Sequence, residues 1–425
     1  MLRRSGLASV ACATMLLFQG SVVRSQDMLM DHGDMQPDST PEFHWGASGI
    51  LFGTRQSPTI DNRPLKEGYL SQPMLMGSAQ FPRYDLSLTA TLNFEGLTLT
   101  RGELNPGISG EGYVDRRHPH TYMHEVVAIW QHSLAERARL SFTAGKGFAS
   151  FGTDDPMVRP LVRYPLNHHL AQILERAVVA GAVNFGPVAV ELSRFNGDEP
   201  ESPSDFPNSD RLFDSWAGRA TAYYRDVLEV QGSFASVVSP EVAAGGGLDQ
   251  KKWSASARYA SGSAYGLAEV AHTQETESGR DAFEFLTMLA EGSVTRARAT
   301  LSARVEQTDR PEEERSADPF RTPRPESDLS ILGRTRWIVM TVNASREFTV
   351  SKARLSPFVE VGRANVKSLD RFSVFDPATF YASNTMWSLS AGIRFGFGMI
   401  HNRMGRYGAA LQKGAMKMDD MDMGQ

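Results

Sequence analysis

WSLSAGIRFGF, residues 387–397, alternates apolar and polar side chains from end to end. Trp387, Leu389 and Ile393 share one parity, whereas Ser388 and Arg394 share the other. Because successive side chains of an extended chain point to opposite faces, this stretch predicts a β-strand with one apolar and one polar face. The alternation alone does not say which face is inside.

The same alternation recurs along the chain. It is found in RARATLSARVE at 296–306, DLSLTATLNF at 85–94, SWAGRATAYY at 215–224 and KWSASARY at 252–259. A large soluble β-sandwich or propeller, with the apolar face in its core, would also produce this pattern. We favour a transmembrane barrel because the segments have about ten residues, the length that a tilted strand needs to cross a bilayer. Aromatic residues also gather near the segment ends, as in an interfacial girdle. They are Trp216, Tyr223, Tyr224, Trp253, Tyr259 and Trp387.

The connections alternate between short and long, which is typical of outer-membrane barrels. Seven short connections are expected near 93–96, 133–136, 184–187, 224–227, 260–264, 292–295 and 347–352. Eight long polar connections are expected near 54–82, 103–122, 147–176, 196–213, 237–251, 273–281, 307–335 and 366–385. We therefore predict an all-β fold, a transmembrane antiparallel β-barrel of about 16 strands (14–18) over residues 43–398, with the short turns on the periplasmic side. The range in strand number arises because 68–82 can be either strand or loop.

Residues 1–25 predict a secretory signal peptide. MLRRSG supplies positive charge, LASVACATMLLF is too short an apolar run for a membrane anchor, and Val23 and Ser25 precede a cleavage site before Gln26. A lipoprotein signal around Cys12 is the alternative. Cys12 is the only cysteine, so a disulfide-stapled mature domain is excluded. Residues 26–42 are then a linker, residues 399–425 are an extension, and the expected location is the outer membrane.

Several functional classes are not expected. The formal net charge of −5 gives no reason to expect a nucleic-acid partner. The sequence contains no GxSxG or HExxH motif and no cysteine nucleophile, so we do not expect an enzyme.

The polar faces of the predicted strands carry an excess of basic residues. The inward basic residues are predicted to be Arg137, Arg139, Arg219, Arg258, Arg296, Arg298, Arg304, Lys352, Arg354 and Arg394. The inward acids are predicted to be Asp85, Glu191, Glu229, Glu306 and Glu360. Fixed charges in a pore set its ion preference, so this lining predicts a mild preference for anions. The alternative is cross-strand pairing that only stiffens the wall.

Histidines gather in DRRHPHTYMHE at 115–125 and in PLNHH at 165–169. In an extended segment His118, His120 and His124 share a face and could converge on a divalent metal ion. His168 or His169, with Met123 and Glu125, could complete the site. The alternative is a set of polar loop residues that bind carbonyl groups and water.

Methionines gather near both mature ends, in QDMLMDHGDM at 26–35 and MKMDDMDMG at 416–424. Thioether sulfur suits Cu(I), so Met416, Met418, Met421 and Met423 are candidate copper ligands. The alternative is a tail in which methionine has no role. No cofactor is required under either interpretation.

Residues 115–200 carry a family resemblance. AGKGFASFG at 144–152, the ERA at 175–177 and SRFNGDE at 193–199 occur in an order that resembles bacterial phosphate-selective-type porins. The DRxHPH and PLxHH segments resemble a set of uncharacterised outer-membrane proteins associated with copper-handling gene neighbourhoods. The resemblance implies a passive channel for small, anionic solutes in the lipid bilayer of the outer membrane, with a homotrimer as one option. The alternative is a copper-binding barrel in metal resistance or uptake. The extension after the last strand departs from the family pattern.

Overall fold

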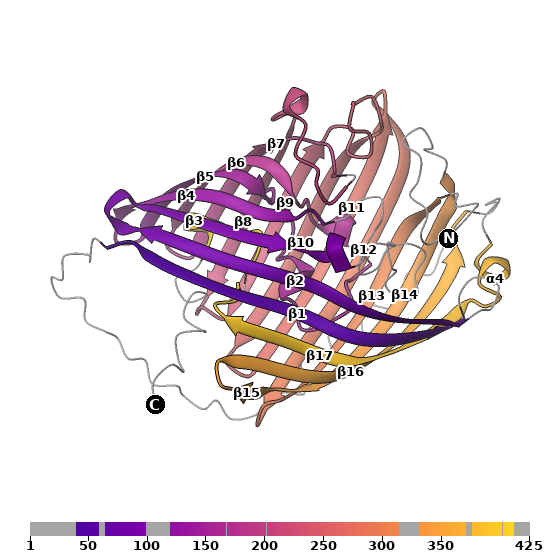
Figure 1. The fold of residues 1–425 in the computed structure, drawn as a ribbon. Helices are drawn as coiled ribbons and strands as arrows, with labels where there is room; N and C mark the ends of the chain where they lie inside the picture. The colour runs from indigo at the N-terminus through magenta and orange to yellow at the C-terminus, as the bar shows by residue number, and fades with distance from the viewer. Residues whose placement is uncertain are drawn as a thin grey trace. The chain divides into compact units, whose positions relative to one another are not determined.

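The computed structural model describes residues 40–58, 64–98, 120–166, 168–200, 202–313, 331–370, 376–401 and 403–411. Most of these residues form one antiparallel sheet that closes into a barrel (Figure 1). The strands are β1 (Glu42–Ser57), β2 (Leu65–Phe81), β3 (Leu86–Asn93), β4 (Met123–Ala135), β5 (Ala138–Gly147), β6 (Arg176–Phe185), β7 (Val188–Phe195), β8 (Ser215–Tyr224), β9 (Leu228–Val237), β10 (Asp249–Ser261), β11 (Ala264–Glu277), β12 (Arg280–Arg296), β13 (Ala299–Glu313), β14 (Ile331–Arg346), β15 (Phe348–Val350), β16 (Ala353–Ser368) and β17 (Thr385–Gly398). β1 pairs with both β2 and β17, which closes the ring. The short β15 continues β14 along the same partner, β16, so the described strands make the predicted barrel of 16 strands.

β2 occupies a segment that we assigned to a long connection from the sequence. Its pairing with β1 changes register between Ser48 and Ile50, and Gln72 has a positive φ of 51°. A bulge of this kind inserts a residue and reverses the alternation, so β2 has no continuous period-2 pattern. The predicted connections at 93–96 and 103–122 imply a strand between them. That prediction is wrong, because α2 (Glu95–Thr98) lies there and begins the long connection to β4.

Seven turns at one end of the barrel alternate with eight connections at the other end, the numbers that we predicted, among the described strands. Two positions differ from the prediction. The first short turn, predicted near 93–96, lies at 82–85 between β2 and β3 and contains η2 (Pro82–Tyr84). The connection predicted at 273–281 is a tight hairpin of Ser278 and Gly279, whose φ values of 50° and 78° suit a two-residue turn between twisted strands. The longer connections contain η4 (Ser209–Arg211) and α4 (Pro377–Phe380).

The apolar faces of the strands point outward. On β13, Leu301 is 59% exposed, whereas Arg304 and Glu306 on the other face are each 1% exposed. The aromatic residues exposed near strand ends include Trp216, Tyr224, Trp253, Tyr259 and Trp387. Tyr223, which we expected among them, points inward because it alternates with Tyr224, and its hydroxyl donates to the Ala410 carbonyl. No helix within the described ranges is long and apolar enough to cross a membrane.

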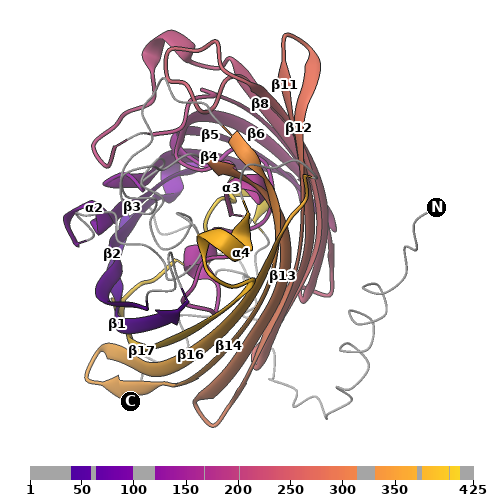
Figure 2. The same ribbon diagram turned by 90° about the vertical axis from the view of Figure 1, so that its right-hand side faces the viewer.

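Two segments fold into the barrel. The inner loop, residues 148–166 and 168–175 between β5 and β6, contains η3 (Pro156–Val158) and α3 (His168–Ala171). The inner tail, residues 399–401 and 403–411 after β17, contains η5 (Gly408–Ala410). Figure 2 looks along the barrel and shows α3 within the ring of strands. Most of the described side chains of both segments are buried.

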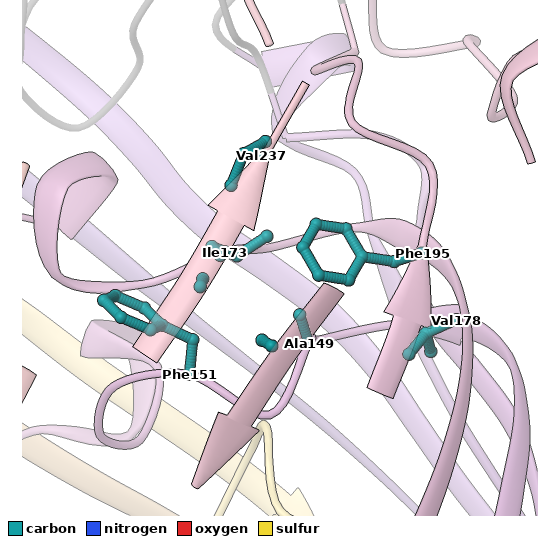
Figure 3. Close-up of a cluster of buried hydrophobic side chains, with 8 residues drawn as sticks. Ala149, Phe151, Ile173, Val178, Phe195 and Val237 are labelled. Carbon is teal, nitrogen blue, oxygen red and sulfur yellow. The ribbon is translucent and has the colours of Figure 1, made fainter. Parts of the chain in front are cut away.

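Apolar contacts hold these segments against the wall. Phe151 and Ile173 of the inner loop belong to a buried cluster with Phe195 and other residues of β6 to β9 (Figure 3). A second cluster joins Met404 and Tyr407 of the inner tail to β4 and to the start of the inner loop. The interior at this level is therefore packed with the chain's own side chains.

Candidate functional site

Arg219 on β8 joins both inner segments to the wall. Its Nε and Nη2 donate to Glu191 Oε2 and Oε1 on β7 at 2.6 and 2.7 Å. Its Nη1 donates to the Gly152 carbonyl of the inner loop and its Nη2 to the Gly405 carbonyl of the inner tail, each at 3.0 Å. Arg219 and Glu191 are each 3% exposed, so this bidentate ion pair is shielded from water and fixes the positions of four segments.

A second charged cluster links the inner loop, the inner tail and β9. Arg403 of the inner tail lies 2.7 Å from Asp154 of the inner loop and 2.6 Å from Glu229 of β9. Arg258 of β10 lies 3.6 and 3.7 Å from the same two carboxylates. Burial alone would raise the pKa of Asp154, but the guanidinium groups of Arg403, Arg258 and Arg406 outweigh it and lower this pKa to about 2. Asp154 is therefore ionised at neutral pH and holds the two inner segments together.

Carboxylates on the wall accept hydrogen bonds from the backbone of the inner loop. Glu360 on β16 accepts from the N–H groups of Val162 and Arg163 at 2.9 and 3.0 Å. Glu306 on β13 accepts from the N–H group of Leu166 at 2.8 Å. These two acids face inward as predicted, but they anchor the inner loop.

The other charges assigned to the interior divide into two groups. Arg139, Arg219, Arg258, Arg304, Arg354, Arg394, Glu191, Glu229, Glu306 and Glu360 lie on the inward face of their strands. Arg137, Arg296, Arg298, Lys352 and Asp85 are exposed in turns or at strand ends, so their inward assignment is wrong. The error arose because we continued the alternation across reversals of the chain. Ala297 and Arg298, for example, have φ values of 49° and 66° and form the β12–β13 turn.

The charge count missed several buried acids of the strands, and three of them lie on two neighbouring strands. They are Glu269, Glu275 and Glu291 on β11 and β12. Arg159 of the inner loop lies 3.8 Å from both Glu269 and Glu291, and Arg304 lies 3.3 Å from Glu291. The alternation in LAEVAHTQET at 267–276 could have found the first two acids. The interior therefore contains more acids than the sequence count implied.

Three segments bring His120, His124 and Glu175 together. His120 lies at the end of the β3–β4 connection, His124 lies on β4, and Glu175 is the last residue of the inner loop. The Nδ1 atoms of His120 and His124 lie 2.7 and 2.6 Å from one carboxylate oxygen, Glu175 Oε1. The three side chains are buried, and their ligand atoms lie within 4.8 Å of one another. This cluster is a candidate metal centre.

Further hydrogen bonds hold the cluster in place. Asp155 Oδ2 lies 3.1 Å from His124 Nε2, and Thr121 donates to Glu175 Oε2 from its N–H at 2.8 Å and from its hydroxyl at 2.5 Å. Burial lowers the pKa of His120, but the hydrogen bond and charge of Glu175 outweigh it and raise the pKa above the ordinary value. Burial would raise the pKa of Glu175, but the charge of His124 and the hydrogen bonds from both histidines hold it well below the ordinary value. The groups can thus form a buried network of carboxylate and imidazolium.

The predicted metal-ligand set is only partly assembled. His120 and His124 meet, whereas the His168 ring packs on Tyr164 at 5.5 Å and its Nδ1 lies 3.2 Å from the Pro165 carbonyl oxygen. Outside the described residues lie His118, the side chain of His169, and the tail methionines Met416, Met418, Met421 and Met423.

Of the two neighbours in sequence that we named as further ligands, Glu125 is not among the grouped ligand atoms. Met123 begins β4. Glu125 accepts a hydrogen bond from the Tyr407 hydroxyl of the inner tail at 3.1 Å.

Glu175 and Asp155 were not predicted from the sequence as members of the cluster. No local motif marks either residue for this role. Glu175 lies 55 positions from His120, and Asp155 lies 31 positions from His124 along the chain. Only the inward course of the inner loop brings them to the histidines.

No family model matches the chain, and no curated protein matches it in sequence. Among solved structures, the chain is similar to an anion-selective porin from Comamonas acidovorans, with 10% identity, a TM-score of 0.52, and coverage of 84% of this chain and 100% of that one. It is also similar to the high-pH structure of OprB from Pseudomonas putida, with 10% identity, a TM-score of 0.50, and coverage of 85% and 95%. At these identities the similarity establishes the fold. The chain has the β-barrel fold of bacterial porins.

Proposed function

We propose that the protein is an outer-membrane channel of the porin kind, in which the inner loop and inner tail restrict passage to small solutes. The observation that carries this proposal is the orientation of the closed barrel, with apolar side chains outside and charged side chains inside. A bilayer is the solvent that suits such an outer band, whereas a large exposed apolar surface is unfavourable in water. The similarity in fold to porins and the signal peptide predicted for residues 1–25 support the same function.

Restriction by the inner segments is supported by the burial of the inner wall. Ser193 on β7 and Ser302 on β13 point inward, yet they are 5% and 2% exposed. The N–H group of Ser150 in the inner loop donates to Ser193 Oγ at 2.9 Å. Because wall groups contact protein at this level, we expect a small conductance.

The proposal also includes the ion selectivity of the channel, which is a preference for anions. The name of the Comamonas porin favours it, but the inward arginines of this chain pair with acids such as Glu191 and Glu291. Paired fixed charges largely cancel in the field that an ion meets. We therefore propose a mild anion preference at most, which reversal potentials across a salt gradient will measure.

Conductance in planar bilayers tests the channel function with three proteins: the full chain, a protein ending at Leu411, and a protein ending at Gly398. The protein ending at Leu411 keeps the inner tail and is the matched control. We expect small steps of equal size from the first two proteins and larger steps from the third. Each protein is first shown to be a folded barrel, which resists detergent until it is heated and therefore migrates faster on a gel when unboiled. Folded proteins that give no steps would contradict the proposal.

Copper handling is the second candidate. The amino-acid composition near the C-terminus supports it, because thioether sulfur suits Cu(I) and this segment contains Met416, Met418, Met421 and Met423. Weaker Cu(I) binding by the protein ending at Leu411 is the expected result, and unchanged binding would exclude the tail. Association of three copies is a further prediction, which chemical cross-linking in detergent tests.

A further inference from the structure

We propose that His120, His124 and Glu175 bind one divalent transition-metal ion of the borderline class, such as Zn²⁺. The ion fastens the β3–β4 connection and the inner loop to β4. The proposal rests on neither the channel function nor the methionine tails. It differs from the site expected from the sequence because Glu175 replaces His118, His168 and His169.

The donor atoms have the composition and proximity that such an ion requires. Two imidazole nitrogens and one carboxylate oxygen are a common set of three protein ligands for zinc, with bonds of about 2.0–2.2 Å. Both Nδ1 atoms face Glu175 Oε1, at 2.7 and 2.6 Å. An ion placed among the three atoms needs each nitrogen to move about 0.6–0.7 Å away from Glu175 Oε1, because ligands at tetrahedral angles lie roughly 3.3 Å apart.

The surroundings of the three ligands match those of a metal centre. Metal-binding histidines usually donate their second ring N–H to a carboxylate, which fixes the ring and its tautomer. His124 has that partner, because Asp155 Oδ2 lies 3.1 Å from its Nε2. Asp155 is itself held by the N–H group of Met157 at 2.7 Å. The second oxygen of Glu175 accepts hydrogen bonds from Thr121, which leaves Oε1 for the ion.

A polar cavity of about 100 Å³ lies beside the cluster and is lined by Glu175 together with Asp198, Glu199 and Asp205. Acids outnumber bases in this lining, which favours cations near Glu175 through the local potential. Lys146 also lines it, but the ammonium group contacts Thr121 Oγ1 at 2.5 Å and lies 4.0 Å from Glu175 Oε2, the oxygen that the ion does not use.

The backbone conformation of Glu175 supports its role as a metal ligand. Its φ is 57°, in the left-handed region that a glutamate seldom adopts. Such a conformation persists only where the surroundings over-determine it. Here it directs the carboxylate of the last inner-loop residue back toward β4.

The competing arrangement uses protons in place of the ion. In that arrangement His124 is an imidazolium between Glu175 and Asp155, and the cluster is a structural ion network. The two arrangements differ in one measurable property, which is whether the folded chain takes up a stoichiometric ion at this position.

The experiment is calorimetric titration of the metal-stripped full chain in detergent with Zn²⁺, repeated with Co²⁺ so that absorption bands report nitrogen and oxygen ligands. The variants are His124→Ala, Glu175→Gln and Asp155→Asn, with His132→Ala as the matched control. His132 also lies on β4, but it is exposed and pairs with Asp85 at 2.7 Å outside the cluster. Heat-modifiable migration shows which variants are folded, and His120→Gln replaces any ligand variant that is not.

We expect His124→Ala and Glu175→Gln to bind one Zn²⁺ fewer than the full chain, and His132→Ala to bind the same number. Asp155→Asn should weaken this equivalent about 10- to 100-fold, as loss of a carboxylate behind a ligand does. If the folded ligand variants bind as many Zn²⁺ ions as the full chain, with equal affinity, the proposal is wrong and the cluster is an ion network.

Discussion

Replacing Arg219 by Met should destabilise the barrel strongly, because it leaves a carboxylate buried without its partner. Arg219 and Glu191 are each 3% exposed. Breaking a buried ion pair by removing one member costs about 3–5 kcal/mol, because the remaining charge stays desolvated. If water filled the space around Arg219, the pair would contribute only about 0–1 kcal/mol. The size of the effect therefore reports whether the inner segments exclude water.

Arg334→Met is the matched control. Arg334 contacts Asp370 with similar geometry, at 2.8 Å between Nη2 and Oδ1 and at 3.1 Å between Nε and Oδ1, but the two side chains are 33% and 31% exposed. We expect it to change the free energy of unfolding by no more than about 1 kcal/mol. The double variant Arg219→Met/Glu191→Met should recover most of the loss, because apolar residues of similar volume often replace a buried ion pair at little cost.

The assay is reversible denaturant unfolding in lipid vesicles, followed by tryptophan fluorescence, for the wild type and the three variants. An effect of Arg219→Met no larger than that of Arg334→Met would refute the reasoning. It would mean that Glu191 remains hydrated and that the inner loop and inner tail do not seal the wall at this level.

Two further predictions concern the inner tail, and one concerns the inner loop. Gly408 has a φ of 53°, and an added Cβ would lie 2.4 Å from Ser141 Oγ, so Gly408→Ala should displace the inner tail and raise the conductance. The control Gly186→Ala, with a φ of 56° and no atom within 4 Å of the added Cβ, should leave the conductance unchanged. Equal conductance of the two variants would count against packing of the tail on β5. Because the pKa of Asp154 is lowered from 3.8 to about 2, its ion pairs contribute fully to stability above about pH 4 and are lost as pH falls toward 2. Conductance should therefore be constant from about pH 8 to about pH 5 and should rise only in stronger acid. A rise near neutral pH would show that other groups hold the tail. Glu360→Gln should lower the free energy of unfolding by about 1–3 kcal/mol, because one amide oxygen cannot replace both acceptors of the inner-loop N–H groups; an unchanged unfolding curve would speak against this anchor.

The sequence predicted the fold well because the barrel depends on a local signal. Alternation is visible wherever a strand lacks irregularities, as in 387–397, and the number of connections follows from the polar segments between such strands. β2 was missed where a bulge beside Gln72 interrupts that signal. Arg298 was misplaced because alternation does not mark the residue at which a chain reverses.

The candidate site was only partly predictable because it depends on contacts between distant segments. The spacing of His120 and His124 showed that they could share a face, but nothing near them in sequence indicates Glu175. The inner loop was expected as a long polar connection, without a direction. Its inward course depends on acceptors such as Glu306 and Glu360, which lie 140 and 198 residues from their N–H partners.

The closure of the interior by the inner tail is tested most directly by the reactivity of a cysteine at position 141. Ser141 on β5 is 1% exposed, and its hydroxyl accepts a hydrogen bond from the N–H group of Ala409 at 2.9 Å. Cys12, in the predicted signal peptide, is the only native cysteine, so Ser141→Cys gives a single thiol in the mature chain. We predict that a charged, water-soluble thiol reagent labels this cysteine slowly in the full folded chain and rapidly in the chain ending at Gly398. Rapid labelling of the full chain, at the rate of the shortened one, would contradict a barrel closed by its own inner tail.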